Sequence, residues 1–194
     1  MNGNGSFGFY SLTDWWTNSF TDQEKTRFKE LYKPLGGSYE DLFKGSGGYG
    51  DSVVWFLTML AGFALNKSDV GIALKFLNKA EEFVGNCTVV DKHFLLNLLI
   101  EVHYKLRDDI RHYQKAKKHC MQQISLASET SDFFLKKYGP PLPRHLGFNQ
   151  FAILLEKEKM YEEAIAVCKE ASQQGWKGNW LDRIQRLRDL AECT

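Results

Sequence analysis

A spacing of large and small apolar residues occurs twice in this chain of 194 residues, and the repetition constrains the fold more than any other feature. The later copy consists of Phe148, Phe151, Ala152, Leu155, Tyr161, Ala164, Cys168 and Ala171. The earlier copy consists of Leu57, Leu60, Ala61, Ala64, Val70, Ala73, Leu77 and Ala80. Apolar residues three and four positions apart lie on one face of a helix. Each copy therefore predicts a pair of helices, one over 53–84 and the other over 147–174.

A third and less regular copy lies between these two. Ala116 and Cys120 have the spacing of Ala164 and Cys168, and we expect a longer helix pair over 92–127. Repeated helix pairs bury a continuous core when about three of them stack. No segment alternates β-branched and polar residues over the length of a strand, so the sequence predicts an all-α fold.

The order of large and small residues over 148–171 resembles the tetratricopeptide repeat. It departs from that family at Lys159, where a small residue is usual, and at Trp176, where a helix-ending proline is common. The resemblance implies a single domain over 1–194, with about three antiparallel pairs stacked into a short right-handed superhelix. A final helix over 179–192, which Asn179 is expected to cap, has a charged outer face that fits a C-terminal capping helix.

The segment 1–50 precedes the pairs and combines aromatic residues, N-terminal helices and a glycine-rich loop. Thr21 and Glu24 have the spacing of a capping box, which predicts that a helix begins there. The aromatic residues before it are Phe7, Phe9, Tyr10, Trp15, Trp16 and Phe20. We expect them to pack on the first helix pair, and the alternative is a binding patch or a dimer contact.

The charge balance favours neither a nucleic acid nor an anionic membrane as a partner of the whole chain. Lys and Arg number 25 against 24 Asp and Glu, which gives a formal net charge of +1. The longest apolar run, over 53–65, is shorter than the roughly 20 residues that span a bilayer. Because the N-terminus has no basic residue followed by an apolar run, we expect no secretory signal and a cytoplasmic protein.

Polar residues recur every four positions on the first helix of the middle pair, and the last pair repeats this spacing with Ile153 in place of one polar residue. They are His93, Asn97, Glu101 and Lys105 in the middle pair, and His145, Asn149 and Lys157 in the last. Residues four apart share one face of a helix. In tetratricopeptide proteins this face lines a groove that receives a peptide, so the resemblance implies a partner-binding surface. The alternative is a stripe that only faces solvent.

A basic segment over 107–119 supports an alternative function. Its cationic residues Arg107, Arg111, Lys115 and Lys118 fall on one side of an expected helix. Such a patch is able to contact phosphates, so the alternative is a nucleic-acid-associated protein. A solvated outer face is the competing interpretation.

The sequence does not predict catalysis, and we expect an adaptor or scaffold rather than an enzyme. His112, His119 and Cys120 lack the spacing of a known metal site. The glycine spacing of the loop 44–52 matches a dinucleotide-binding loop, but no predicted strand precedes it. We therefore expect no metal, no cofactor, a protein or peptide partner, and a monomer or a homodimer.

Overall fold

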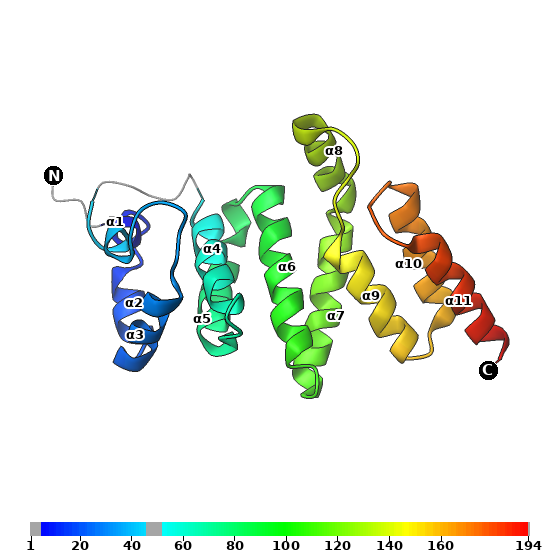
Figure 1. Ribbon diagram of the computed structural model, residues 1–194, viewed down its shortest axis with the longest axis horizontal. Coiled ribbons are helices and arrows are strands. Elements are labelled where there is room, and N and C mark those ends of the chain that lie inside the picture. The colour runs from blue at the N-terminus through cyan, green and yellow to red at the C-terminus, as the bar shows by residue number, and fades with distance from the viewer. Residues whose placement is uncertain (1–4, 46–51, 194) are drawn as a thin grey trace. The chain divides into compact units, whose positions relative to one another are not determined.

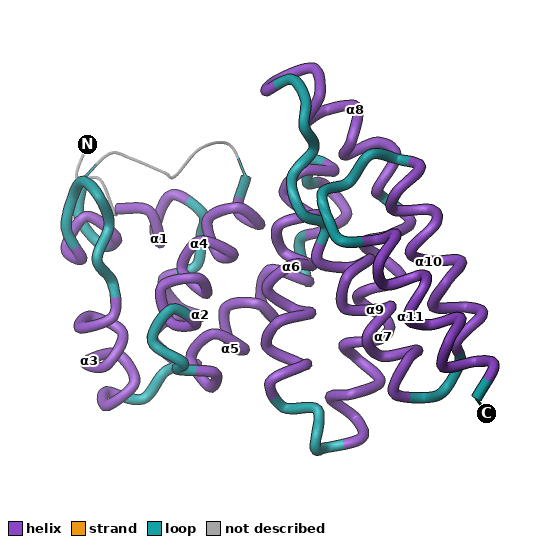
Figure 2. Tube along the Cα trace, turned by 45° about the vertical axis from the view of Figure 1, so that its right-hand side comes forward, coloured by secondary structure: helices purple, strands orange, loops and turns teal. Residues whose placement is uncertain are grey.

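The computed structural model describes residues 5–45 and 52–193. Within those ranges the secondary structure is helical and contains no strand, as Figure 2 shows, which confirms the predicted all-α class. The contacts divide the chain into two compact units, Met1–Leu98 and Leu99–Thr194. None of the described helices is long and apolar enough to cross a membrane. The glycine-rich loop lies largely outside the described residues.

Unit 1 contains five α-helices, two short 3-10 helices and the beginning of a sixth α-helix within its described residues. They are α1 (Gly5–Phe9), α2 (Thr13–Ser19), α3 (Asp22–Leu31), η1 (Tyr39–Leu42), α4 (Val53–Leu65), α5 (Val70–Glu81), η2 (Val84–Asn86) and the first part of α6 (Val89–Lys105). The predicted capping box is present at the start of α3, where Thr21 and Glu24 exchange hydrogen bonds.

Unit 2 contains the end of α6 and five further helices within its described residues. They are α7 (Ile110–Ser125), α8 (Ala127–Tyr138), α9 (Leu146–Lys157), α10 (Tyr161–Gln173) and α11 (Trp180–Glu192). Figure 1 shows α9, α10 and α11 packed in sequence order. The helix predicted over 179–192 is α11, and the segments predicted over 92–127 are α6 and α7.

The two helix pairs expected from the repeated spacing are present, one in each unit. In unit 1 α4 packs on α5, and in unit 2 α9 packs on α10. The small residues of the pattern are fully buried in both pairs: Ala61, Ala64, Ala73, Ala80, Ala152, Ala164 and Ala171. Alanine at a helix contact lets two helix axes approach closely, so the spacing correctly predicted which faces pack.

The turns that join these two pairs have the same conformation. Ser68 and Lys159 both have a φ of 60°, and each lies two residues before the second helix of its pair. The next amide donates to the last turn of the first helix in both cases, from Asp69 to Ala64 and from Met160 to Leu155. Both residues therefore adopt the left-handed conformation that glycine adopts most readily.

The aromatic residues of the N-terminal segment pack on α4 and α5, as expected. Phe7 contacts Phe56 with 5.5 Å between ring centroids, and Trp16 stacks on Phe76 at 6.0 Å. Phe7 and Trp16 are buried, whereas Phe9 is 62% exposed. Most of the aromatic surface is therefore part of the core of unit 1 rather than a free binding patch.

The core of unit 2 is formed where α6, α7 and α9 meet. Ile100, Cys120 and Leu154 are fully buried together, with Tyr113 packed against them. The Tyr113 hydroxyl donates to the Glu158 carboxylate at 2.9 Å, and Lys117 contacts the same carboxylate at 2.5 Å. These polar contacts at the edge of the apolar core tie α7 to the end of α9.

Candidate functional site

The polar stripe expected on α6 belongs to two different units, and its members differ in exposure. Asn97 is half-buried in unit 1. In unit 2, Glu101 and Lys105 form an ion pair at 2.8 Å, and both are partly exposed. Lys157 on α9 donates to the Tyr104 hydroxyl at 3.1 Å. Glu101, Lys105 and Lys157 are thus engaged in contacts within the chain.

Two predicted members of this surface, His93 and His145, are buried, which corrects their assignment to an exposed face. His93 is 3% exposed and contacts Phe94, and its burial lowers its pKa to about 4. His145 is fully buried, and its Nδ1 accepts a hydrogen bond from the Phe148 backbone at 3.3 Å. An imidazole that caps a helix and packs on aromatic rings has a structural role that the four-residue spacing did not indicate.

The four basic residues that were expected on one helix do not all lie on it. Arg107 lies before α7, in the turn after α6, and its guanidinium stacks 4.4 Å from the centre of the Tyr104 ring. Arg111 is on α7, but its Nε and Nη2 groups both donate to the Asp109 carboxylate. Lys115 and Lys118 are exposed on α7. Two of the four predicted cations are therefore already occupied by neighbouring groups.

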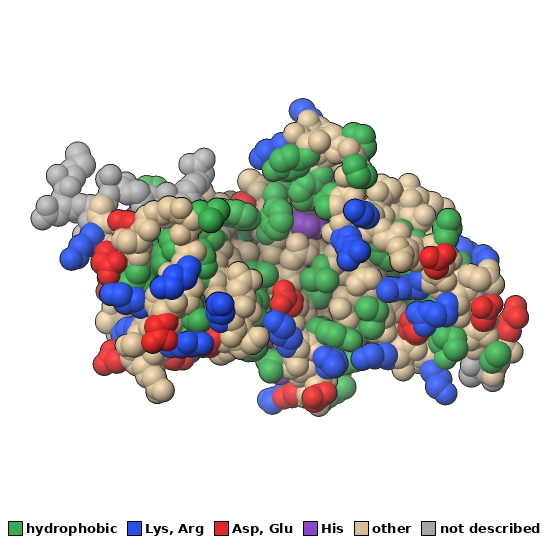
Figure 3. Space-filling model, viewed as in Figure 1, with side chains coloured by type: hydrophobic (Ala, Val, Ile, Leu, Met, Phe, Trp, Pro, Cys, Tyr) green, Lys and Arg blue, Asp and Glu red, His purple; other side chains and the backbone are tan. Residues whose placement is uncertain are grey.

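Asn149, the remaining residue of the stripe, lines a cavity of about 350 Å³ in unit 2. The residues around this cationic cavity are Arg144, His145, Leu146, Asn149, Lys177, Gly178, Asn179, Trp180 and Arg183. They come from the beginning of α9, the beginning of α11 and the loops that precede these helices. Figure 3 shows Lys and Arg side chains gathered where α9 begins. Three cations and two amides line the cavity, and no carboxylate does.

Backbone contacts join the two loops that line the cationic cavity, one before α9 and the other before α11. Leu142 and Trp176 form a parallel bridge, and the Lys177 amide donates to the Pro143 carbonyl at 3.2 Å. These contacts place Arg144 near Lys177, although the two residues are far apart in the sequence. Across the cavity, the Arg183 guanidinium donates to the Asn149 carbonyl at 3.1 Å and ties α11 to α9.

Trp180 forms a fixed wall of the cationic cavity. Its indole N–H donates to the Trp176 carbonyl at 2.6 Å, and the side chain is 5% exposed. Gly178 lies against this ring, since a Cβ at that position would meet indole atoms at 2.5 to 2.8 Å. A residue with a side chain would displace the indole, so the shape of the cavity depends on glycine here.

The amides of the cationic cavity are available. The Asn149 and Asn179 side chains have no hydrogen-bond partner among the described residues, and α11 starts without the side-chain cap expected from Asn179. Arg144 and Lys177 likewise form no ion pair within the described part of the chain. These donors therefore face the cavity without an acceptor from the protein itself.

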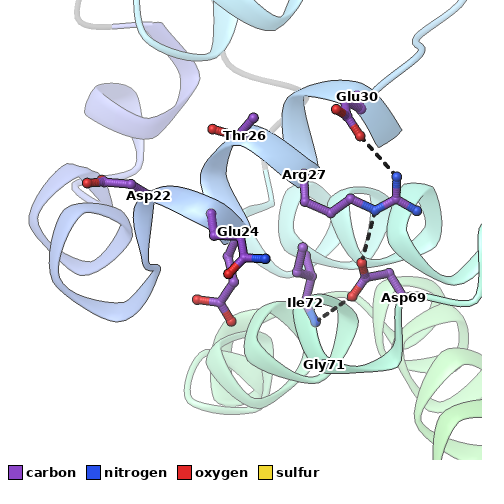
Figure 4. Close-up of a pocket in the computed structure, with 9 residues that line it drawn as sticks. Asp22, Glu24, Thr26, Arg27, Glu30, Asp69, Gly71 and Ile72 are labelled. Atoms are coloured by element: carbon purple, nitrogen blue, oxygen red, sulfur yellow. Dashed lines mark hydrogen bonds and ion pairs between the residues drawn. The ribbon is translucent and has the colours of Figure 1, made fainter.

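A cavity in unit 1 provides a contrast, because its charges are paired. It has a volume of about 800 Å³ and lies between α3 and the beginning of α5. Figure 4 shows Arg27 between Glu30 and Asp69, with distances of 3.0 and 3.4 Å. Its other carboxylates contact lysines, as the pairs Glu24–Lys75 at 2.6 Å and Asp22–Lys25 at 3.8 Å show. The ion pairs around this acidic cavity therefore link α3 to α5.

The sequence prediction missed Arg144, Lys177, Asn179 and Arg183 as members of a site. The available signal was their position at the starts of two expected helices, where basic and amide residues are close to unpaired backbone donors. Their proximity across two loops had no sequence signal. Among the described residues, no group of three or more His, Cys, Asp and Glu side chains is arranged to hold a metal ion.

Comparison with known proteins gives one distant relative and no family. No family model matches the chain, and no solved structure matches it. An uncharacterized protein of Aquifex aeolicus (strain VF5) is 27% identical over 130 residues. The aligned region covers 67% of this chain and 61% of that protein, so the chain spans less than two thirds of the relative's length.

Proposed function

We propose that this chain is a non-catalytic helical module that binds a protein or peptide segment through unit 2, acting as an adaptor or scaffold. The observation that carries this proposal is the cationic cavity, where Asn149 and Asn179 present amides that no described residue engages. Fixed helices and a buried Trp180 surround these groups. A preformed site with unsatisfied donors binds a partner with little loss of its own conformational entropy.

We further propose that the helix pairs are of tetratricopeptide type. The shared turn conformation at Ser68 and Lys159 supports this assignment, as does the burial of alanines at matching positions of both pairs. Modules of stacked helix pairs present preformed helix faces to a partner, which is consistent with the proposed binding role.

The experiment selects binding peptides from a random displayed library with the full chain as target. Affinities of the selected peptides are then measured by fluorescence anisotropy for the chain and for the double variant Asn149→Ala/Asn179→Ala. We expect the variant to bind at least about tenfold more weakly, because two amide contacts are removed.

A matched control for this experiment is Asn18→Ala/Asn78→Ala, since both of these asparagines are exposed in unit 1. The control is expected to bind as the unmodified chain does. If the selected peptides bind the Asn149/Asn179 variant with unchanged affinity, the proposed binding surface is wrong.

The nucleic-acid alternative has less support from the geometry. Of the four cations that define this alternative, Arg111 is held by Asp109 and Arg107 stacks on Tyr104, whereas Lys115 and Lys118 are exposed. A phosphate contact at Arg111 would have to replace its ion pair. We therefore keep the peptide-binding proposal and test the alternative separately.

A further inference from the structure

The cationic cavity concentrates positive charge, and no carboxylate lines it, although the Glu156 carboxylate that pairs with Arg186 also interacts electrostatically with Arg183. Arg144, Lys177 and Arg183 line it, and among the described residues none of the three takes part in an ion pair. Asp182, in the first turn of α11, does not line it but lines an adjoining cavity that shares Lys177, Gly178, Asn179 and Trp180 with it. In the acidic cavity of unit 1, by contrast, each carboxylate has a cationic partner within reach.

The fold holds these cations together against their mutual repulsion. Cations that line one cavity repel one another. The loop bridge of Leu142 and Trp176 and the hydrogen bond of Lys177 to Pro143 nevertheless place the two loops together. Arg183 is oriented by its bond to the Asn149 carbonyl. A bound anion would remove this repulsion.

Neutral donors add to the same site. The amide groups of Asn149 and Asn179 line the cavity. Helix α11, of 13 residues, begins there, and no side chain caps its first turn. The first amides of a helix carry a partial positive charge, and they favour an anion beside them. The cations and the amides therefore favour a ligand that offers several hydrogen-bond acceptor oxygens.

We propose that the cationic cavity binds the phosphate group of a phosphorylated side chain on the partner segment. This inference rests on the proposed peptide-binding function and specifies the group that the cavity recognises. A phosphate monoester carries a charge of about −1.5 to −2 near neutral pH and offers three acceptor oxygens. A carboxylate carries only one charge, so three cations match the phosphate better.

The size and shape of the cavity agree with this group. A volume of about 350 Å³ is near the lower end of the range of about 300 to 1,000 Å³ for ligand sites, which suits one side-chain group. Two arginines line it, and the planar guanidinium binds two phosphate oxygens at once. Trp180 in the lining is buried, whereas Arg144 and Lys177 are exposed and Arg183 is half-buried.

The test titrates the full chain with small probes and follows the backbone amide and tryptophan indole N–H signals by NMR. The probes are N-acetyl-O-phosphoserine amide, inorganic phosphate and N-acetylglutamate amide. We expect both phosphates to shift the signals of residues 144–149 and 177–183, and the glutamate probe to bind at least about tenfold more weakly.

Charge reversal provides the matched variants. Arg144→Glu/Lys177→Glu changes two exposed loop residues of the cavity, and it is expected to weaken phosphoserine binding by at least about tenfold. Lys169→Glu/Arg188→Glu changes two exposed residues of unit 2 that do not line the cavity, with the same change in net charge. The control is expected to bind within about twofold of the unmodified chain, because distant surface charges are screened.

Three outcomes would overturn the inference: no shift with either phosphate, equal binding of the glutamate probe, or equal weakening in both charge-reversal variants. A further arm separates the inference from the proposed function. Peptides selected by the chain are measured with and without a phosphoserine. Peptides that bind through Asn149 and gain nothing from phosphorylation overturn the inference alone. Free phosphate that binds while no peptide does overturns the proposed function alone.

Discussion

The side-chain carbonyl of Gln123 accepts a hydrogen bond from the backbone N–H of Gly147, with 2.6 Å between oxygen and nitrogen. Both residues are buried, and the bond ties α7 to the first turn of α9. A Cβ on residue 147 would lie 2.7 Å from the same oxygen, so glycine allows the close approach. The orientation of α9, and with it the place of Asn149, depends on this contact.

Removal of this contact is expected to destabilise unit 2. Gln123→Ala leaves the buried Gly147 N–H without its acceptor, which costs about 1–3 kcal/mol in the free energy of unfolding. Urea denaturation followed by circular dichroism measures the loss. Gln114→Ala, at an exposed position of α7, is the control and should change stability by less than about 0.5 kcal/mol. Equal stability of the two variants would contradict the role of the bond.

The aromatic core of unit 1 gives a second prediction. Phe76 is fully buried and contacts Trp16, Phe20 and Phe28 with 4.9 to 6.0 Å between ring centroids. Phe76→Ala is expected to destabilise unit 1 by about 3–5 kcal/mol, because it removes these contacts and leaves a cavity. Tryptophan fluorescence during denaturation follows the change. Phe9→Ala, at a residue 62% exposed, should have little effect, and a comparable loss there would refute the argument.

Acid is expected to destabilise unit 2 through His103. Burial, together with His119, His112 and Lys115, lowers the pKa of His103 from 6.5 to about 4. The unfolded chain therefore binds a proton at a higher pH than the folded chain. Stability from this residue is complete above pH 6.5 and decreases as the pH falls toward 4, by at most about 1.4 kcal/mol per pH unit.

Denaturation at pH 7 and pH 5 measures this dependence. The interval lies above the range in which carboxylates such as Glu156 and Glu158, whose pKa values are lowered by Arg186 and Lys117, become protonated. His103→Gln should reduce the difference in unfolding free energy between the two pH values, whereas Gln114→Ala should not. An unchanged difference in His103→Gln would show that His103 does not carry the effect.

The ion pair of Arg186 and Glu156 is expected to make a small contribution. Arg186 Nη2 lies 2.7 Å from one Glu156 oxygen, and Nη1 contacts the other, so the pair is bidentate. Arg186 is about half exposed, which limits the coupling energy to about 1 kcal/mol. A double-mutant cycle of Arg186→Met and Glu156→Gln measures it, and Arg188→Met serves as a control for loss of charge. A coupling energy of zero would show that the contact does not stabilise α11 on α9.

The basic-segment alternative is tested by a salt titration. We expect no binding of a DNA duplex or a single strand at low salt, since two of the four cations, Arg107 and Arg111, are already engaged by Tyr104 and Asp109. Anisotropy of labelled oligonucleotides measures it. Binding that weakens steeply with salt and disappears in Arg111→Glu/Lys115→Glu would establish the alternative instead.

The sequence was sufficient to predict the helix pairs because the relevant information is local. A repeated spacing of apolar residues determines which face of each helix is buried, and the alanines of both pairs are indeed buried. The start of α3 was also predictable, since a capping box involves residues only three positions apart. The position of Arg107 in the turn before α7, where its guanidinium stacks on Tyr104, was not predicted.

The candidate site was predictable only in part. Asn149 was identified from the polar spacing, but the same spacing also selected His145, which is buried by Trp176 and Phe148. A period of four residues identifies a helix face and does not show what packs against it. Packing partners from other helices decide whether a polar residue on that face is buried or free.

The sequence by itself determined the helical class, the paired helices and the small residues at their contacts, because these depend on periodicity within short segments. Only the tertiary structure decided that Arg144, Lys177 and Arg183 share one cavity. The bridge between Leu142 and Trp176 brings them together, and such a contact depends on the positions of whole helices. Electrostatic recognition needs charges that are close in space, and closeness across loops is a property of the fold.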